Sequence, residues 1–324
     1  MAFEMADISA LESKMRLKYL DCLKGFLIML VVWGHVVQNA AVDFFSTVSF
    51  RTIYSFHMAT FFFISGIVLQ LGRHGVRTLF GKMQRLLIPY LSWYVLCIVV
   101  FQPVQFSKAF AFAFSSKSVG LWFLFTLVEC IVACAISEAV APKRWEMPVI
   151  GLIMVGLAVF CRNQYVDLMH FAKFYQYYLG GYLMAARCEW IVSPQRSIGE
   201  WNCRMIVLAS VVFVVGLFIA AITRFGGMKF QIYKVIVSWA GCMSLLALFR
   251  VLSQRGVVIN ALSTIGKMTL GIYAVHIFLL LLCGVYVRTW PLGVTFAVLL
   301  VVSTVIVVVI KRVPLLAIVL LGRS

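Results

Sequence analysis

Two titratable residues in the first long apolar stretch of the chain have the types and the spacing needed for chemistry. Lys24 and His35 are eleven residues apart. In an α-helix of about 100° per residue, this spacing places both side chains on one face, about 16 Å apart along the axis. Asp21 lies one turn before Lys24, close to the same face. A charged stripe is costly against lipid, so we expect it to face a protein interior or a wet cavity.

The chemistry available to this stripe is proton transfer at one end and anion binding at the other. A neutral imidazole can take a proton from a hydroxyl group, which makes His35 a candidate general base. A lysine ammonium such as that of Lys24 can bind phosphate or extend to lipid head groups. The structural alternative is a histidine satisfied by a hydrogen bond between helices. The pattern predicts a passage with an anion site at one end and a base deep inside.

Three further candidates follow, one in the second apolar stretch and two in the basic loop before the third. His57 is a second candidate base, and Tyr54 lies three residues earlier on its face. The alternative is a belt of interfacial aromatic residues with one polar member. Lys82 and Arg85, at i and i+3 within KMQRLLIPY, suit a polyanion such as a nucleotide phosphate. Ordinary enrichment of cations in cytoplasmic loops would also explain that pair.

The later apolar stretches carry candidates for binding a substrate or for orienting a histidine. Trp122 and Glu129 are seven residues apart and share a helix face. A carboxylate near the middle of a span needs a partner or stays protonated, so Glu129 could orient a histidine, bind a substrate hydroxyl or form a structural pair. Tyr273 and His276, at i and i+3, fit a structural role and a functional role equally well. Lys234 is interpreted as extending toward the membrane surface.

The composition indicates a membrane protein. Of the 324 residues, 63% are hydrophobic and only 12% are charged, and the mean hydropathy is +1.02. The net charge of +17 is typical of cytoplasmic loops that contact anionic lipids. Nucleic-acid binding is excluded as the main function, because the basic residues are scattered and form no single patch. No phosphate-binding loop, zinc motif or serine-hydrolase elbow is present, so no metal is expected.

Ten apolar stretches predict an all-α bundle of about ten transmembrane helices. With ten spans, 19 of the 28 Lys and Arg residues lie on the same side of the membrane as the N-terminus. This excess predicts that both termini are cytoplasmic. We expect one membrane domain over residues 1–324, with a cytoplasmic N-terminal segment at 1–19 and a cytoplasmic tail at 311–324. The predicted spans are 20–42, 52–71, 89–104, 121–141, 148–161, 171–186, 205–222, 232–252, 262–287 and 292–310.

Several segments resemble the acyltransferase-3 family of integral membrane acyltransferases. The opening run RLKYLDCLKGFLIMLVVWGH is similar to the start of that family, in which a basic residue and a histidine are separated by ten residues. FHMATFFFISG, KMQRLLIPY and IGKMTLGIYAVHIF fit the same family in the same order. Two positions depart from the usual pattern: Lys24 stands where many members have Arg, and Ala59 stands where Pro is common. Neither departure removes a charge that the predicted roles need.

The resemblance implies an enzyme that moves an acyl group, commonly acetyl, from acyl-CoA to a hydroxyl of a carbohydrate. By this resemblance His35 is the catalytic histidine and Lys24 its paired cation, while Lys82 and Arg85 handle the acyl-CoA. Glu129, His57 and His276 are the candidates for orienting His35, and the residues alone do not choose among them. Asp21, Trp122, Tyr273 and His276 are predicted to lie along the substrate path.

The implied partners are acyl-CoA, with acetyl-CoA as the expected donor, a carbohydrate or glycolipid acceptor, and membrane lipids. The expected location is the bacterial cytoplasmic membrane, and the oligomeric state is left open. A transporter or flippase for a glycan or an anion is the alternative function, because transporters also keep charges near the middle of the membrane. Matched pairs of helix-breaking residues in two inverted halves would favour transport, and the sequence has no clear example.

Overall fold

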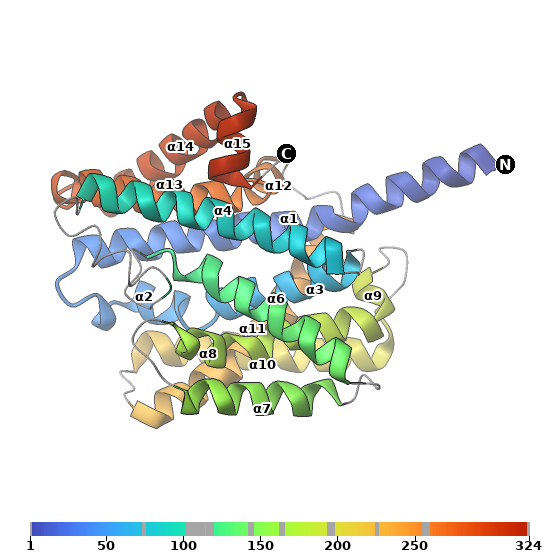
Figure 1. The fold of residues 1–324 in the computed structure, drawn as a ribbon. Helices are drawn as coiled ribbons and strands as arrows, with labels where there is room; N and C mark the ends of the chain where they lie inside the picture. Colours follow the sequence, from blue (N-terminus) through green and yellow to red (C-terminus); the bar gives the residue numbers. More distant parts are fainter. Residues whose placement is uncertain are drawn as a thin grey trace. The chain divides into compact units, whose positions relative to one another are not determined.

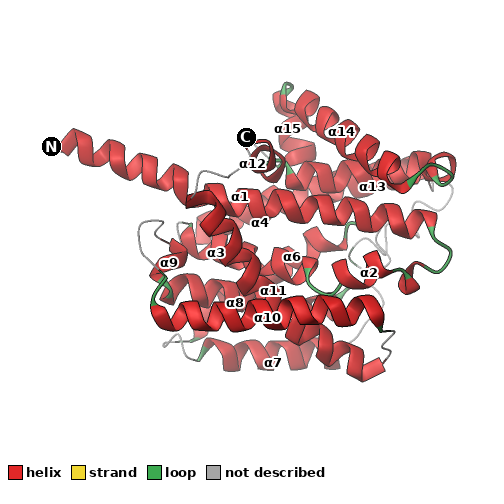
Figure 2. Cartoon of the chain, turned by 180° about the vertical axis from the view of Figure 1, so that it is seen from behind, coloured by secondary structure: helices red, strands yellow, loops and turns green. Residues whose placement is uncertain are grey.

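The structure, a computed structural model, describes residues 2–72, 76–101, 114, 120–141, 146–161, 166–192, 198–223, 227–254 and 260–322. Every regular element within these ranges is a helix (Figure 2). The predicted all-α class is therefore confirmed. Residues 102–104 of the predicted third span and residues 323–324 of the predicted tail lie outside the described residues.

Within the described ranges, eight helical segments are long and apolar enough to cross a membrane. Two more helices complete the predicted set of about ten: α7 (Met147–Phe160) is apolar but short, and α8 (Leu168–Arg187) is long but less apolar. Each predicted span coincides with at least one helix, which makes the chain an integral membrane protein. The eight segments are Lys18–Ala40, Val48–Leu71, Leu79–Phe101, Trp122–Val140, Asn202–Ile222, Gln231–Ser253, Thr269–Val287 and Leu292–Lys311.

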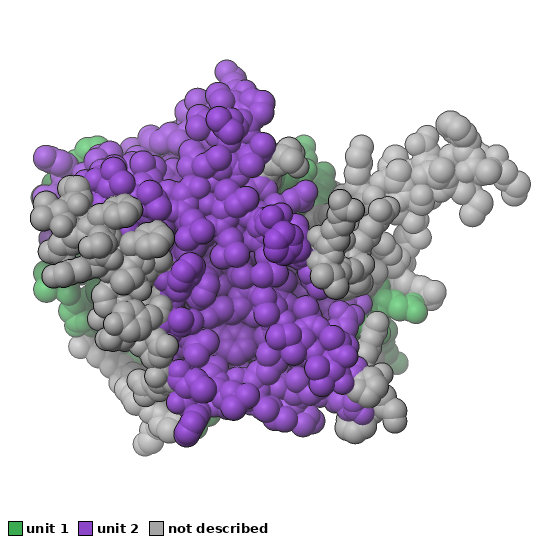
Figure 3. Space-filling model, viewed as in Figure 1, with its two compact units in different colours: residues 1–64, 184–269, 289–296 green, residues 65–183, 270–288, 297–324 purple. Residues whose placement is uncertain are grey.

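The chain forms two compact units, each assembled from separate stretches of sequence (Figure 3). Unit 1 comprises residues 1–64, 184–269 and 289–296, and unit 2 comprises residues 65–183, 270–288 and 297–324. Four of the described helices contribute to both: α3 (His57–Leu71), α8, α14 (Leu292–Lys311) and, by its first residue alone, α13 (Thr269–Val287). The single membrane domain expected over 1–324 stays a prediction.

Unit 1 is built around α1 (Ala2–Ala40), which Figure 1 shows as one long helix. It packs against α2 (Val48–Ile53), α11 (Gly227–Gln254) and α12 (Asn260–Gly266). The helix α10 (Glu200–Ile222) packs against α2 and α11, and the short elements η1 (Phe44–Ser46) and α9 (Glu189–Val192) complete the unit.

Two glycines let α1 and α12 touch along their backbones. A Cβ atom on Gly25 would meet the carbonyl oxygen of Leu262, and one on Gly266 would meet the carbonyl oxygen of Asp21. Small residues allow this close approach between membrane helices. The contact therefore holds the middle of α1, around Asp21 and Lys24, against α12.

Arg51 of α2 closes the end of α10. Its Nη1 and Nη2 atoms donate hydrogen bonds to the carbonyl oxygens of Thr223 and Ala221, each at 3.0 Å. The last carbonyls of a helix lack partners within the helix and carry partial negative charge, so a guanidinium there is stabilising. This contact joins the segment that precedes His57 to α10.

Unit 2 contains α4 (Val76–Phe101), α6 (Trp122–Val140), α7, α13 (Thr269–Val287) and α15 (Pro314–Leu321), with most of α8 and α14. Within it, α6 packs against α4 and α7. Tyr178 of α8 approaches α3 closely, because a Cβ on Gly66 would meet the Tyr178 carbonyl oxygen.

The sequence did not predict α15, which lies within the segment expected to be a tail and packs against α4. Pro89 lies inside α4 rather than at its start. Its missing N–H leaves the carbonyl of Arg85 without a helical partner, and a Cβ on Gly322 would meet that same carbonyl oxygen. Trp93 Nε1 donates to the Leu320 carbonyl oxygen at 2.9 Å. The freed turn of α4 is thus where the end of α15 docks.

Two predicted spans are interrupted in the structure. The ninth, 262–287, is split at Lys267 and Met268 between α12 and α13, and the second, 52–71, is split at 54–56 between α2 and α3. An apolar window records length and hydropathy but does not detect a turn inside it. Both breaks matter for the site, because each places a polar residue at the end of a helix.

Candidate active site

The N-terminal part of the first span, in unit 1, carries a cluster of charges. Lys24 Nζ lies 3.1 Å from Asp21 Oδ1, and the two side chains are 26% and 13% exposed. Cys22, the residue after Asp21, is buried, and the charges of Asp21, Lys18 and Lys267 all act on its thiol. Lys267 occupies the turn directly after Gly266, so the close packing of Gly266 on Asp21 brings this lysine to α1.

A fourth cation, Arg250, belongs to the same unit. Its side chain is only 2% exposed, and its guanidinium lies 5.5 Å from the ring centre of Trp190. Its charge also acts on Tyr19, whose hydroxyl donates to the Ile191 carbonyl oxygen at 2.8 Å. The sequence analysis did not single out Arg250, because one arginine near the cytoplasmic end of a span also fits the positive-inside pattern. Its position inside an apolar run was the available signal.

His35 lies further along α1, partly exposed within unit 1. The adjacent Gly34 faces Tyr54: a Cβ on Gly34 would lie 2.8 Å from Tyr54 Cε2 and 3.3 Å from the Tyr54 hydroxyl oxygen. The ring of Tyr54 therefore lies against α1 beside His35. The charge of His35, when it is protonated, acts on His57, so the structure brings these two predicted histidines into one neighbourhood.

His57 is the first residue of α3, just after the break that follows α2. Its Nδ1 atom lies 2.7 Å from the Ile53 carbonyl oxygen. A carbonyl oxygen only accepts, so Nδ1 carries the proton, and in the neutral ring Nε2 keeps its lone pair. Tyr54 meets the ring edge-on, with the two centres 4.6 Å apart, and the charge of Lys234 on α11 also acts there. Lys234 therefore lies near the histidines.

Unit 1 thus has cations around one part of α1 and, further along that helix, the imidazole of His35 with that of His57 from α3 in its neighbourhood. The first group can hold an anion through charge, and the second can accept a proton from a hydroxyl group. Asp21, Lys24, His35 and His57, four of the predicted site residues, belong to this unit. Their individual roles stay predictions.

The other predicted cations, Lys82 and Arg85, lie on α4 in unit 2. The Nζ atom of Lys82 is buried and has no hydrogen-bond partner among the described residues. It lies close to Gly72, because a Cβ built there would be 2.6 Å from it. Arg85 is exposed. A buried ammonium without a partner is costly unless an anion binds to it.

Tyr273 bonds to the start of another helix of unit 2, whereas His276 bonds within its own helix. The Tyr273 hydroxyl donates to the Gly120 carbonyl oxygen at 2.6 Å, just before α6 begins. Gly120 has a φ of 74°, a conformation that favours glycine. His276 is fully buried, and its Nδ1 lies 2.8 Å from the Ile272 carbonyl oxygen. Tyr273 therefore anchors the start of the helix that carries Trp122 and Glu129.

Trp122 stacks on a histidine that the sequence analysis missed. The rings of Trp122 and His170 are 4.0 Å apart and nearly parallel, and Phe174 stacks beside them. The Nδ1 atom of His170 bonds to the carboxylate of Asp167. The predicted sixth span began at residue 171, so Asp167 and His170 fell outside it. An aspartate three residues before a histidine, just ahead of a helix, was the available signal.

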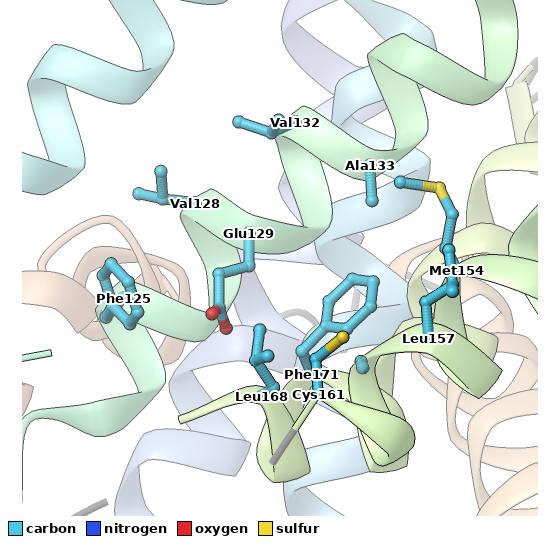
Figure 4. A pocket seen from close by; sticks show the side chains of 11 residues that line it. Phe125, Val128, Glu129, Val132, Ala133, Met154, Leu157, Cys161, Leu168 and Phe171 are labelled. Carbon is cyan, nitrogen blue, oxygen red and sulfur yellow. The ribbon is translucent and has the colours of Figure 1, made fainter. Parts of the chain in front are cut away.

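Glu129 lies on α6 and lines an apolar cavity of unit 2 (Figure 4). Its Oε2 atom is buried and has no hydrogen-bond partner in the described part of the chain. The charge of Asp167 acts on it. Within unit 2, Trp122, Glu129 and the Asp167–His170 pair therefore form one polar region.

Comparison with known proteins places the chain in a family. A family model described as an acyltransferase domain, of the acyltransferase-3 type, matches residues 17–313. The nodulation protein NolL of Sinorhizobium fredii (strain NBRC 101917 / NGR234) is 28% identical over 172 residues, which cover 44% of this chain and 46% of the relative. The chain thus spans about half the length of that curated relative. No solved structure matches.

The matched residues include all ten predicted site residues, from Asp21 to His276. They also include the helices that bring His35 and His57 together and those that carry the cations. Because the match extends over most of the chain, the protein belongs to the acyltransferase-3 family.

Proposed function

We propose that the protein is an O-acyltransferase that moves an acetyl group from cytoplasmic acetyl-CoA to a hydroxyl group of a lipid-linked or cell-surface carbohydrate. The observation that carries the proposal is the arrangement of α1, with Asp21 and Lys24 among cations at one part and His35 beside His57 further along. The length of helix between Lys24 and His35, about 16 Å, suits a donor with an anionic end and a reactive end far apart.

The proposed donor site uses charge and the proposed acceptor site uses basicity. Lys24, Lys18 and Lys267 attract the phosphates of CoA, and Arg250 is a further cation of the same unit. In unit 2, Lys82 and Arg85 keep their predicted role as phosphate-binding cations. We place the protein in the bacterial cytoplasmic membrane with the N-terminus inside, in agreement with the distribution of Lys and Arg.

In the proposed reaction, the imidazole of His35 takes the proton of the acceptor hydroxyl. The hydroxyl oxygen bonds to the carbonyl carbon of the thioester, and the bond from that carbon to sulfur breaks. The sulfur of CoA leaves with the electron pair and takes up the proton, which regenerates neutral His35. The same residue can instead accept the acyl group on nitrogen and pass it on. In this reaction His57 is a positioning residue for His35, because the hydrogen bond from its Nδ1 to the Ile53 carbonyl oxygen fixes its ring.

Mass spectrometry of glycans tests this function in cells. Lipid-linked and surface glycans from cells with and without the gene are compared after identical extraction. The proposal predicts a mass difference of one acetyl unit on a carbohydrate, which disappears after mild alkaline treatment because the bond is an ester. Identical glycan masses in the two strains, with the protein present in the membrane, would contradict it.

The alternative from the sequence, a transporter or flippase, is separated by a second measurement. An acyltransferase releases free CoA from acetyl-CoA only when an acceptor is present, whereas a transporter does not consume acetyl-CoA. Purified protein, acetyl-CoA and a glycan extract from cells that lack the gene suffice for this assay. Release of CoA that depends on the extract favours the proposed enzyme over transport.

A further inference from the structure

Unit 2 contains an apolar cavity that none of the proposed steps uses. It lies between α6, α7 and the first turns of α8 and has a volume of about 520 Å³ (Figure 4). That volume is within the range of sites for small organic ligands. Apart from one carboxyl group, the lining is hydrocarbon, aromatic rings and sulfur. The lining residues are Phe125, Val128, Glu129, Val132, Ala133, Met154, Leu157, Ala158, Cys161, Leu168 and Phe171.

The one carboxyl group in this lining belongs to Glu129. Figure 4 shows its two oxygens turned away from α6, on the side of Leu168. Oε2 is buried and lacks a hydrogen-bond partner among the residues that the structure describes. A polar oxygen left in apolar surroundings loses its bonds to water without gaining others, which costs free energy. A ligand that brings a hydroxyl group into the cavity would supply the missing hydrogen bond.

A second polar group lies at the α8 end of the cavity. Asp167 caps the first turn of α8 by accepting from the His170 backbone N–H at 3.4 Å, and its other oxygen bonds to His170 Nδ1. In the neutral ring, Nε2 of His170 then keeps a lone pair, and the side chain is 26% exposed. Leu168 and Phe171 of the same turns line the cavity, and the charge of Asp167 acts on Glu129. Polar groups thus gather at one end of an apolar cavity.

We propose that this cavity binds a neutral amphiphile with a hydroxylated head group. A single hydrocarbon chain lies among the apolar side chains of α6 and α7, and a head-group hydroxyl forms a hydrogen bond with Glu129. His170 accepts from a second hydroxyl at the mouth of the cavity. A quaternary ammonium head group fits less well, because it has no hydrogen-bond donor for Glu129. The proposal concerns binding alone and does not depend on acyl transfer at His35.

The test uses the full chain in phosphatidylcholine nanodiscs and an alkyl glucoside with a twelve-carbon chain that carries a photoreactive diazirine. After irradiation, digestion and mass spectrometry locate the labelled peptides. We expect saturable labelling of α6, α7 and the start of α8, which unlabelled dodecyl glucoside prevents. Dodecane and dodecyltrimethylammonium should compete at least about tenfold less well, because neither supplies a hydroxyl group.

Two pairs of variants connect the labelling to the cavity. Glu129→Leu should weaken binding about tenfold through the lost hydrogen bond, whereas Glu138→Leu, at an exposed glutamate of the same helix, should bind normally. Ala158→Phe fills the cavity and should abolish the labelling. Val159→Phe adds the same ring at the neighbouring position, which is 45% exposed and outside the lining, and should leave it intact.

Three outcomes would overturn the proposal. They are the absence of saturable labelling in the wild type, equal binding by Glu129→Leu and wild type, and equal competition by dodecane or by dodecyltrimethylammonium. Equal competition by dodecane would mean that the cavity holds bilayer hydrocarbon. His35→Ala should bind the probe normally, so a failure of acyl transfer and a failure of this binding site are separate results.

Discussion

At the scale of single residues, His57 owes its chemical state to one backbone contact. Its Nδ1 is held at 2.7 Å from the Ile53 carbonyl oxygen, so the ring offers its Nε2 to its surroundings. Those surroundings include Tyr54, His35 and Lys234. A residue that only fixed the turn between α2 and α3 would need the Nδ1 bond alone, and a residue that positions the reacting groups would need Nε2 as well.

His57→Asn separates these two roles. The amide of Asn can donate to the Ile53 carbonyl oxygen as Nδ1 does, but it has no group at the position of Nε2. We expect kcat for acyl transfer to fall about 10²-fold with KM for acyl-CoA unchanged, and the thermal midpoint to stay near that of the wild type. A variant with the kcat of the wild type would show that His57 acts only on the turn.

Lys82 gives a second prediction at this scale. Gly72→Ala places a methyl group beside the buried ammonium, and a flexible lysine end moves away at little cost to the fold. We expect KM for acyl-CoA to rise several-fold with kcat unchanged, because a phosphate-binding cation is displaced. Gly81→Ala on α4 is the matched control, since a Cβ there has open space. Equal KM values for Gly72→Ala and Gly81→Ala would contradict the role of Lys82.

At the scale of the helices, the contact between α1 and α12 positions the cations of unit 1. The backbones touch where Gly25 and Gly266 lack side chains, and the chain turns at Lys267 directly afterwards. A longer side chain at either glycine would separate the helices. It would also move Lys267 away from Asp21 and Lys24, so stability and anion binding should change together.

Gly266→Ala tests this coupling. The added Cβ meets the Asp21 carbonyl oxygen, which is backbone and cannot move aside, so we expect a loss of about 1–3 kcal/mol in stability. A thermal unfolding scan in detergent measures it as a lowered midpoint, together with a raised KM for acyl-CoA. Gly293→Ala, where a Cβ has open space, is the control. A midpoint for Gly266→Ala no lower than that of the control would mean that the two backbones do not touch.

The helices themselves were predictable from the sequence. A long apolar run that crosses lipid must pair its own backbone polar groups, and a helix does so. The interruptions of the helices were not predictable. Lys267 and residues 54–56 form turns inside runs that stay apolar on average, and Pro89 looked like a helix start although it lies within α4. His35 and Lys24 were predictable from spacing along one helix. His170 and Arg250 were not, since their ring partners Trp122 and Trp190 come from separate segments of the chain.

At the scale of the whole molecule, the distribution of charge predicts an orientation. Of the 28 Lys and Arg residues, 19 fall on the side of the N-terminus, and cytoplasmic loops carry such an excess. Counting spans from a cytoplasmic N-terminus places the end of α7 outside and the start of α10 inside. Two exposed cysteines mark these positions, Cys161 and Cys203.

Labelling of these thiols checks the orientation. In single-cysteine variants expressed in intact cells, a membrane-impermeant maleimide should modify Cys161 directly. It should modify Cys203 only after the membrane is permeabilised, because the reagent cannot reach the cytoplasmic side otherwise. The opposite pattern would reverse the orientation and with it the access of cytoplasmic acyl-CoA to the cations around Lys24.

The most direct test of the account is acetyl transfer by His35→Ala. Purified wild-type protein, His35→Ala and Met29→Ala, a control at a partly exposed position of the same helix, are incubated with acetyl-CoA and glycan extract. The rates of CoA release and of glycan acetylation are then compared. We predict a loss of about 10²–10⁴-fold for His35→Ala and near wild-type rates for Met29→Ala. Full acetylation by a correctly inserted His35→Ala protein would contradict the central claim that this imidazole serves the transfer.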